Sequence, residues 1–204
     1  MKIVFIFFVL IKGFFLTADE VKITKFIPYV DVVDSGKHIR IKRINKPNSY
    51  LTNSYELTSR PSPPFFIQPF SMDKGIETYG ELEVLDFISK KKGVFIDARL
   101  RNWYLKSAIP SAVNIPFKLF LSKTDERTKI LKKLGGINNK GKWDFSHAQT
   151  ILLYCNGAWC GQSPTAIRAL IDLGYPKDKM KYYRGGMQAW QLLGLTTIVP
   201  KEKK

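Results

Sequence analysis

Residues 150–164 of the chain read TILLYCNGAWCGQSP. The first five are β-branched, apolar or aromatic, which is the pattern of a short buried strand. Gly157 and Gly161 let the backbone bend, and Ser163 followed by Pro164 is typical of a helix N-cap and the first helical residue. The stretch therefore predicts a strand, a tight loop and a helix in direct succession, the repeating unit of α/β folds.

The chain on both sides of this stretch continues the alternation. Short apolar runs predict further strands at residues 94–97 and 181–183. Apolar residues at helical spacing predict helices at residues 81–90, 124–134, 163–173 and 187–193. We therefore expect an α/β domain over residues 76–198, with a largely parallel sheet flanked by helices, and a basic tail at residues 199–204.

Residues 19–75 are expected to form a strand and loop extension ahead of this domain. Two strands are predicted at residues 30–33 and 38–44, and the Asp34-Ser35-Gly36 turn between them indicates a hairpin. Residues 45–62 are rich in Asn, Ser, Pro and Thr and are expected to form a loop.

The N-terminus has the pattern of an export signal. Lys2 follows the first methionine, an apolar run occupies residues 3–11, and Ala18 precedes an acidic start. This order matches a secretory signal peptide over residues 1–18 and predicts an exported, periplasmic protein. Lys12 interrupts the apolar run, and the alternative is an uncleaved segment that anchors the chain to a membrane.

The composition limits the classes of function. The chain has 33 basic and 17 acidic residues and a formal net charge of +16, but the basic residues are spread along it and are mostly lysine. Specific nucleic-acid binding is therefore not expected, whereas peripheral contact with an anionic membrane remains open. Two cysteines, with two histidines far apart in sequence, do not provide the ligands of a metal centre. We expect no metal and no cofactor.

The loop after residue 154 carries the chemistry. Cys155 follows the predicted strand directly, at the edge where ligands bind in α/β sheets. The loop glycines can turn backbone N–H groups inward, and these donors form an anion-binding nest with the positive end of the next helix. Because such a field lowers the pKa of a thiol, Cys155 is the predicted nucleophile.

Other roles of the two cysteines remain open at this point. Cys155 could be a small buried hydrophobic side chain, and Cys155 and Cys160 could form a structural or a reversible disulfide. A cysteine-dependent phosphatase is excluded, because the sixth position after each cysteine is Gly161 or Ala166 instead of an arginine that clamps phosphate. A thioredoxin-type pair is excluded because residues 156–159 lie between the cysteines, two residues more than that motif has.

Four motifs, in order, resemble the rhodanese-like (sulfurtransferase) family. FIDAR at residues 95–99 is similar to its strand and D-x-R signature, and Tyr154-Cys155 is similar to its central strand and catalytic cysteine. IPSAVNIP at residues 109–116 is similar to its I-P-G-A-x-N-I-P segment, with Ser111 in place of glycine. YRGGMQAW at residues 183–190 is similar to its closing G-G-x-x-x-W element. Together they cover residues 80–195.

The resemblance is closer to an exported subset whose active loop reads C-N-G-x-x-C-x-x-S-P. That subset carries an upstream C-P-P-F-C motif, which corresponds here to SPPFF at residues 62–66, without either cysteine. Any role of those two cysteines is therefore absent from this chain.

The resemblance implies a parallel sheet flanked by helices and a persulfide mechanism. The Cys155 thiolate would take a sulfane sulfur and pass it to a thiol or another nucleophilic acceptor. Asp97 and Arg99 would support the loop through hydrogen bonds, and Arg184 would add positive charge beside it. The persulfide cradle would consist of Asn156, Gly157, Ala158, Trp159, Cys160 and Gly161.

The loop departs from the family pattern in length and charge. It is two residues longer than usual between Cys155 and Gln162, and it lacks the basic side chain that attracts thiosulfate. A small sulfur donor such as polysulfide, or a persulfide carrier, is as well suited as thiosulfate, and the acceptor could be a protein. Cys160 could act as a resolving thiol, and Trp159 could shield the sulfur, stack on a substrate or simply pack.

Two alternatives to this enzyme remain. The first is a non-catalytic rhodanese-like binding module that docks a partner through residues 19–80. The second is a thiol–disulfide redox protein that uses Cys155 and Cys160.

Overall fold

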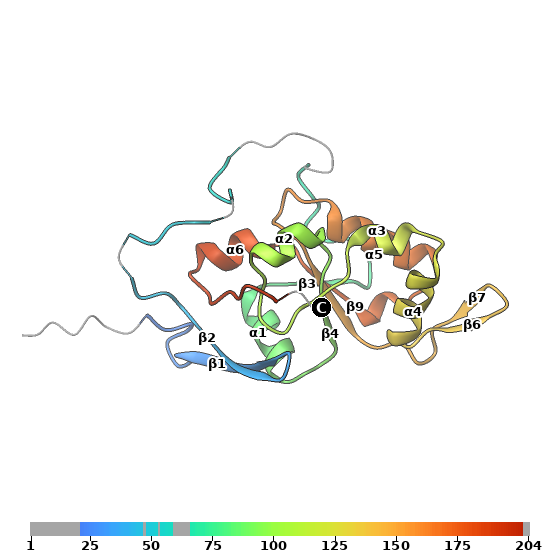
Figure 1. Cartoon of the computed structure of the whole chain (residues 1–204), viewed down its shortest axis with the longest axis horizontal. Helices are drawn as coiled ribbons and strands as arrows, with labels where there is room; N and C mark the ends of the chain where they lie inside the picture. Colours follow the sequence, from blue (N-terminus) through green and yellow to red (C-terminus); the bar gives the residue numbers. More distant parts are fainter. Residues whose placement is uncertain (1–20, 47, 53, 59–65, 202–204) are drawn as a thin grey trace, which may run out of the picture.

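The computed structural model describes residues 21–46, 48–52, 54–58 and 66–201 of the chain. Its centre is a five-stranded sheet in the order β3-β9-β8-β4-β5, in which every pair of neighbours is parallel (Figure 1). The strands are β3 (Glu77–Tyr79), β4 (Val94–Asp97), β5 (Val113–Asn114), β8 (Ile151–Tyr154) and β9 (Met180–Tyr183). The expected α/β fold with a parallel sheet flanked by helices is confirmed.

Helices cover both faces of the sheet. One face packs against α1 (Glu81–Ser89) and α6 (Gly186–Leu192), and the other against α3 (Phe117–Leu121), α4 (Asp125–Lys133) and α5 (Gln162–Asp172). The short helix α2 (Arg101–Lys106) follows β4, and a 3-10 turn, η1 (Lys177–Lys179), precedes β9.

The strands divide their side chains between two hydrophobic clusters because successive strand residues point to opposite faces. In β8, Leu152 and Tyr154 belong to the cluster under α1 and α6, while Ile151 and Leu153 belong to the cluster under α5. All four residues of β8 are buried, so the strand that leads to Cys155 is enclosed on both faces.

The N-terminal extension contains the predicted hairpin, formed by β1 (Tyr29–Asp34) and β2 (Lys37–Lys42). Ser35 and Gly36 have φ values of 48° and 80°, the left-handed conformation that two-residue hairpin turns need. Val32 and Ile41 are buried in the cluster under α1, beside which the hairpin lies in Figure 1. The extension therefore shares a core with the sheet.

The end of the chain also joins the extension to the sheet region. The amide of Ile44 donates to the carbonyl of Gly194 (2.7 Å), and the amide of Thr196 donates to the carbonyl of Lys42 (3.1 Å). Ala108 and Ile198 exchange two backbone hydrogen bonds of 2.8 Å and 3.0 Å. The segment after α6 is thus held between the hairpin and the loop that follows α2.

The predicted N-cap of α5, Ser163, is wrong by two residues. The helix begins at Gln162 with Gly161 as its N-cap residue, and the Ser163 side chain makes no capping bond. Ser163 is instead fully buried close to Cys155, and its hydroxyl and backbone N–H help to lower the pKa of that thiol.

Several short elements escape prediction because they are too brief to show a period. They are β3, β5, α2, α3 and a second hairpin made of β6 (Ile137–Asn139) and β7 (Lys142–Asp144), which projects beside α4 in Figure 1. The signal peptide predicted at residues 1–18, and residues 62–65 of the proline-rich motif, lie outside the described residues. In the part of the chain that the structure describes, no helix is both long and apolar enough to cross a membrane.

Candidate active site

Cys155 lies directly after β8, the central strand, and the loop that follows runs into α5. The first turn of α6 packs on this loop: the amide of Met187 donates to the carbonyl of Cys155 (3.0 Å), and that of Gln188 to the carbonyl of Asn156 (2.9 Å). Gly186 makes this approach feasible, because its φ is +56° and a Cβ there would lie 2.3 Å from the Cys155 carbonyl oxygen. The second glycine of the G-G-x-x-x-W element is therefore needed to seat the loop.

The Cys155 side chain is 2% exposed and faces several hydrogen-bond donors. Burial by itself raises the pKa of this thiol. Donors from the Cys160 thiol, the Ser163 hydroxyl and the backbone N–H groups of Ser163 and Asn156 outweigh burial and lower the pKa of Cys155 to about 7. Near neutral pH a large fraction of Cys155 is therefore the nucleophilic thiolate.

Cys160 is the protonated partner of this pair. Its side chain is fully buried, and burial together with the charge on Cys155 raises the pKa of Cys160. Both cysteines are free thiols. When Cys155 is protonated, its Sγ donates to the Cys160 carbonyl oxygen over 3.2 Å. Cys155 Sγ is thus in direct contact with the Cys160 backbone, and the two side chains lie close enough to shift each other's pKa.

Two buried hydroxyl groups near Cys155 were not identified from the sequence. Among the described residues, Ser163 Oγ and Tyr182 Oη have no hydrogen-bond partner at standard geometry, although Ser163 lies close enough to Cys155 to lower its pKa. The pKa of Tyr182 is raised by burial and then by the charges on Cys155 and Cys160, so its hydroxyl keeps its proton. Tyr182 lies in β9 and belongs to no sequence motif. Its pattern is that of an ordinary buried strand residue, so the sequence does not indicate that it lies near Cys155.

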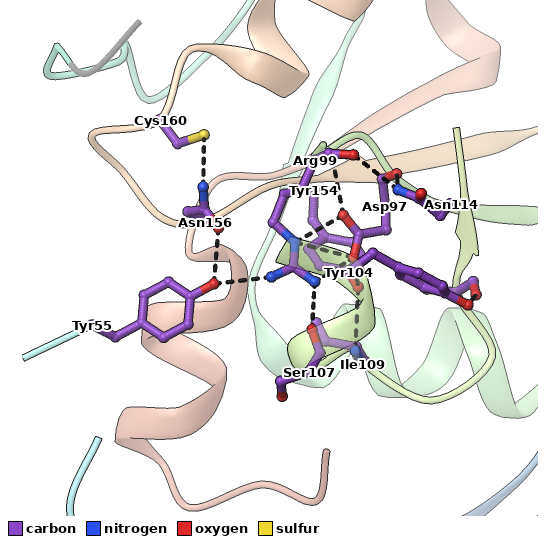
Figure 2. Close-up of polar contacts among 11 residues, drawn as sticks. Tyr55, Asp97, Arg99, Tyr104, Ser107, Ile109, Asn114, Tyr154, Asn156 and Cys160 are labelled. Atoms are coloured by element: carbon purple, nitrogen blue, oxygen red, sulfur yellow. Dashed lines mark hydrogen bonds and ion pairs between the residues drawn. The ribbon is translucent and has the colours of Figure 1, made fainter. Parts of the chain in front are cut away.

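Asp97 and Arg99, predicted to support the loop, form a buried ion pair (Figure 2). Arg99 Nη2 lies 2.5 Å from Asp97 Oδ2, and the two side chains are 1% and 0% exposed. The same Nη2 donates to the Ser107 carbonyl (2.6 Å), and the Tyr154 hydroxyl donates to Asp97 Oδ2 (2.7 Å). Burial opposes the charge on Arg99, but the Asp97 carboxylate raises its pKa well above the usual value, so the guanidinium is always charged.

The ion pair reaches the loop through Tyr55, a residue of the extension. Arg99 Nη1 donates to Tyr55 Oη (2.9 Å), and Tyr55 Oη donates to Asn156 Oδ1 (2.8 Å). Asn156 Nδ2 then donates to Cys160 Sγ over 3.7 Å, completing the chain drawn in Figure 2. Asp97 and Arg99 therefore act on the loop indirectly, and Tyr55 carried no sequence signal because it lies in a segment of loop composition.

The predicted cradle residues have different roles. Asn156 and Gly157 are buried, and the Asn156 N–H faces the Cys155 thiol. The Cys160 N–H donates to the Gly157 carbonyl (2.9 Å), so the expectation that it faces the sulfur is not met. Gly161 begins α5 as its N-cap residue. The N–H of Ser163, which lies outside the predicted cradle, also faces the Cys155 thiol.

The active-site loop is held by contacts with α6 and with the N-terminal extension. Trp159 Nε1 donates to Gln188 Oε1 (2.7 Å), and the indole is half-buried against the cluster under α6, so it packs. The Ala158 carbonyl accepts from the Gln68 N–H (2.9 Å), and Arg184 donates to the Gln68 carbonyl through Nε (3.1 Å) and Nη2 (3.0 Å). Arg184 therefore holds the extension onto the loop, and the role predicted for its positive charge stays a prediction.

Metal-ligating residues do not cluster in the described parts of the chain. No group of three or more His, Cys, Asp or Glu side chains there could hold a metal ion. The chemistry available at the site is that of a low-pKa thiol, a second thiol and a set of hydrogen-bond donors.

Comparison with known proteins gives one curated relative and several solved structures. The HTH-type transcriptional regulator Rv0324 of Mycobacterium tuberculosis is 31% identical over 100 residues, which are 49% of this chain and 35% of the regulator. This chain thus spans about a third of that relative. Among solved structures, the human single-domain sulfurtransferase TSTD1 is 16% identical, covering 56% of this chain and 95% of that one, with a TM-score of 0.42.

Two further solved structures each align with more than half of this chain. The thiosulfate sulfurtransferase of Pseudomonas aeruginosa is 18% identical, covering 63% of this chain and 21% of that one (TM-score 0.44). The rhodanese from E. coli is 21% identical, covering 52% and 98% (TM-score 0.35). The family described as "Rhodanese-like domain" matches residues 82–193. This match spans more than half of the chain, and the protein belongs to the rhodanese-like domain family.

Proposed function

We propose that this protein is a sulfurtransferase that carries sulfane sulfur on Cys155. The observation that supports this most directly is the buried thiol after the central strand, whose pKa is lowered to about 7 by surrounding donors. A thiolate is the form that attacks sulfur, and donors already aimed at it can stabilise the charge of a persulfide without rearranging.

The proposed reaction has two displacement steps. The Cys155 thiolate attacks the outer sulfur of a donor R–S–SH, the donor S–S bond breaks, RS⁻ leaves, and Cys155–S–SH forms. A thiolate acceptor then attacks the outer sulfur of this persulfide, and the Cys155 thiolate leaves. The Asn156 and Ser163 N–H groups and the Ser163 hydroxyl hold the negative charge on Cys155 before and after each step.

A slim donor suits this site better than thiosulfate. The loop from Cys155 to Gln162 has no basic side chain, and Arg184 is engaged with the Gln68 carbonyl. The Cys155 side chain is 2% exposed, so bulky donors are hindered. We propose inorganic polysulfide or a low-molecular-weight persulfide as donor and a thiol, free or on a protein, as acceptor.

A dithiol redox reaction is the second candidate, because the two cysteines contact each other directly. Oxidation to a Cys155–Cys160 disulfide would release two electrons and two protons to an external disulfide or quinone, and an external thiol would reverse it. This reaction needs both cysteines, whereas sulfur transfer needs Cys155 alone.

The place of action is a further proposal. The order of charge and hydropathy in residues 1–18 supports an exported, periplasmic protein, with membrane anchoring as the alternative. The excess of lysine supports peripheral contact with anionic lipid and not specific nucleic-acid binding.

The test is a turnover assay with inorganic polysulfide as donor and glutathione as acceptor, in which glutathione persulfide and hydrosulfide are measured. Cys160→Ser is the matched control for Cys155→Ser, since both remove a buried thiol from the same loop. We expect wild-type protein and Cys160→Ser to turn over and Cys155→Ser to fall to the protein-free rate. Equal loss in both variants would favour the redox reaction, and no turnover by the wild type would overturn the enzyme assignment.

A further inference from the structure

We propose that Tyr55, which lies ahead of the rhodanese-like domain, is a positioning residue of the active-site loop. Its hydroxyl fixes the orientation of the Asn156 amide and thereby directs the Cys160 S–H toward Cys155. The inference rests on Cys155 as the proposed nucleophile, but it concerns the charge state of Cys155 and not the identity of the sulfur donor.

The orientation of the Tyr55 hydroxyl follows from its neighbours. A guanidinium only donates hydrogen bonds, so the 2.9 Å contact between Arg99 Nη1 and Tyr55 Oη makes the phenol oxygen an acceptor there. Burial raises the pKa of Tyr55, and the hydroxyl keeps its one proton. That proton is then directed to the other close partner, Asn156 Oδ1, at 2.8 Å.

The orientation of Asn156 follows in turn. Its amide has one accepting oxygen and one donating nitrogen, and the oxygen is held by Tyr55. The NH₂ group must therefore face the opposite side, where Cys160 Sγ lies 3.7 Å away. Figure 2 shows the nitrogen of Asn156 pointing at the sulfur and its oxygen at the phenol.

Cys160 completes the chain by donating to Cys155. Its sulfur already accepts a hydrogen bond from Asn156, so its own proton is free for Cys155. Cys155 Sγ lies 3.2 Å from the Cys160 carbonyl oxygen, and the Cys160 side chain lowers the pKa of Cys155. Each group thus donates toward the nucleophile, from the Arg99 guanidinium through Tyr55, Asn156 and Cys160. Hydrogen bonds aligned in one direction polarise and strengthen one another. Loss of the Tyr55 hydroxyl would let the amide turn and accept the Cys160 proton, removing that donor from Cys155.

The extension is built to hold Tyr55 in this place. The side chain is 1% exposed, its ring packs against Trp103 with centroids 6.0 Å apart, and its carbonyl accepts from Gln188 Nε2 (2.7 Å). Gln188 also accepts from Trp159 of the active-site loop, so one side chain of α6 connects both segments. The active site is therefore assembled from the extension as well as from the sheet.

The experiment is a pH titration of the full chain labelled with ¹³Cβ-cysteine, which reports the pKa of each thiol by NMR without a reagent that must reach it. Tyr55→Phe removes the hydroxyl and keeps the ring. Tyr175→Phe is the matched control, because Tyr175 is also buried and its hydroxyl donates to the Leu134 and Gln149 carbonyls, which are not part of this loop. The same titration is run in a Cys160→Ala background with and without Tyr55→Phe.

We expect Tyr55→Phe to raise the Cys155 pKa by about one unit, the equivalent of one hydrogen bond, and Tyr175→Phe to leave it unchanged. In the Cys160→Ala background, Tyr55→Phe should cause no further shift, because the path runs through Cys160. An unchanged Cys155 pKa in Tyr55→Phe would overturn the proposal and leave Tyr55 a structural anchor. A shift that persists without Cys160 would also overturn it. Neither readout depends on sulfur transfer, so failure of the enzyme assignment would be recognised separately by the turnover assay.

Discussion

The hydroxyl of Tyr55 donates a 2.8 Å hydrogen bond to Asn156 Oδ1, although 101 residues of chain separate the two. The bond is buried and joins a segment ahead of the family domain to the residue after Cys155. A fragment trimmed to the matched residues 82–193 would lack Tyr55, the β1–β2 hairpin and β3. Biochemical work on this protein should therefore retain residues 21–81 as well.

The reactivity of Cys155 should depend on pH with a midpoint near 7. Its pKa is lowered to about 7, so the thiolate fraction falls about tenfold per pH unit below that value and levels off above it. The measurement is the rate of reaction with a small uncharged haloacetamide, assigned to Cys155 or Cys160 by peptide mass spectrometry. Cys160 in the same samples should react far more slowly, because its pKa is raised. A Cys155 midpoint at the ordinary thiol value of about 8.5 would contradict the donor arrangement.

The same shift should appear in folding stability. The pKa of Cys155 is lower in the folded than in the unfolded chain, so between the two values the unfolded state binds more protons and stability rises with pH. The contribution is fully present above the unfolded value and is lost as the pH falls through about 7. Urea unfolding under reducing conditions should show the advantage of wild type over Cys155→Ser growing by on the order of 2 kcal/mol across this window. Parallel pH profiles for the two proteins would show that the folded-state shift is absent.

Breaking the buried ion pair should be costly. Arg99→Leu leaves the Asp97 carboxylate buried with its main charge partner gone, and such a loss destabilises proteins by about 3–5 kcal/mol. Arg40→Leu is the control, because the Asp31–Arg40 pair has the same type of contact (2.9 Å) but side chains that are about half exposed. We expect that change to have a far smaller effect in denaturant unfolding, because water screens an exposed pair. Similar losses in both variants would show that the Asp97–Arg99 pair is not specially important for the fold.

Ser111 should show an order of stability that depends on its backbone. It has a φ of 72° where the related motif carries glycine, its Oγ donates to the Val33 carbonyl (2.9 Å), and its amide donates to Asp34 Oδ1 (2.9 Å). Ser111→Ala keeps the strained conformation and loses a hydrogen bond worth about 1 kcal/mol. Ser111→Gly loses the same bond but relieves about 1 kcal/mol of strain, so thermal unfolding should rank it above Ser111→Ala and near wild type. Equal stability of the two variants would contradict this explanation.

The sequence predicts those parts of the fold whose structure is determined by residues within the same short segment. Residues 81–90 and 124–134 have a helical apolar period, residues 151–154 a continuous apolar run, and the Asp34-Ser35-Gly36 turn the residues that a positive φ requires. The position of Cys155 after a buried strand follows from the same local pattern.

The remaining features depend on contacts between distant segments. Tyr55 lies in a stretch with no periodicity, and its role is visible only when Arg99 and Asn156 are brought to it by the sheet. The position of Ser163 before a proline predicts an N-cap, but the helix begins earlier, and Ser163 is buried beside Cys155, whose pKa it lowers. Tertiary context overrode a local preference at the place where the chemistry is located.

The most direct test of the central claim is intact-mass spectrometry of the reduced protein after exposure to inorganic polysulfide, with wild type, Cys155→Ser and Cys160→Ser measured side by side. Persulfide formation on Cys155 predicts a gain of about 32 Da in wild type and in Cys160→Ser, and none in Cys155→Ser. A gain that requires Cys160 and not Cys155, or no gain in the wild type, would contradict the account.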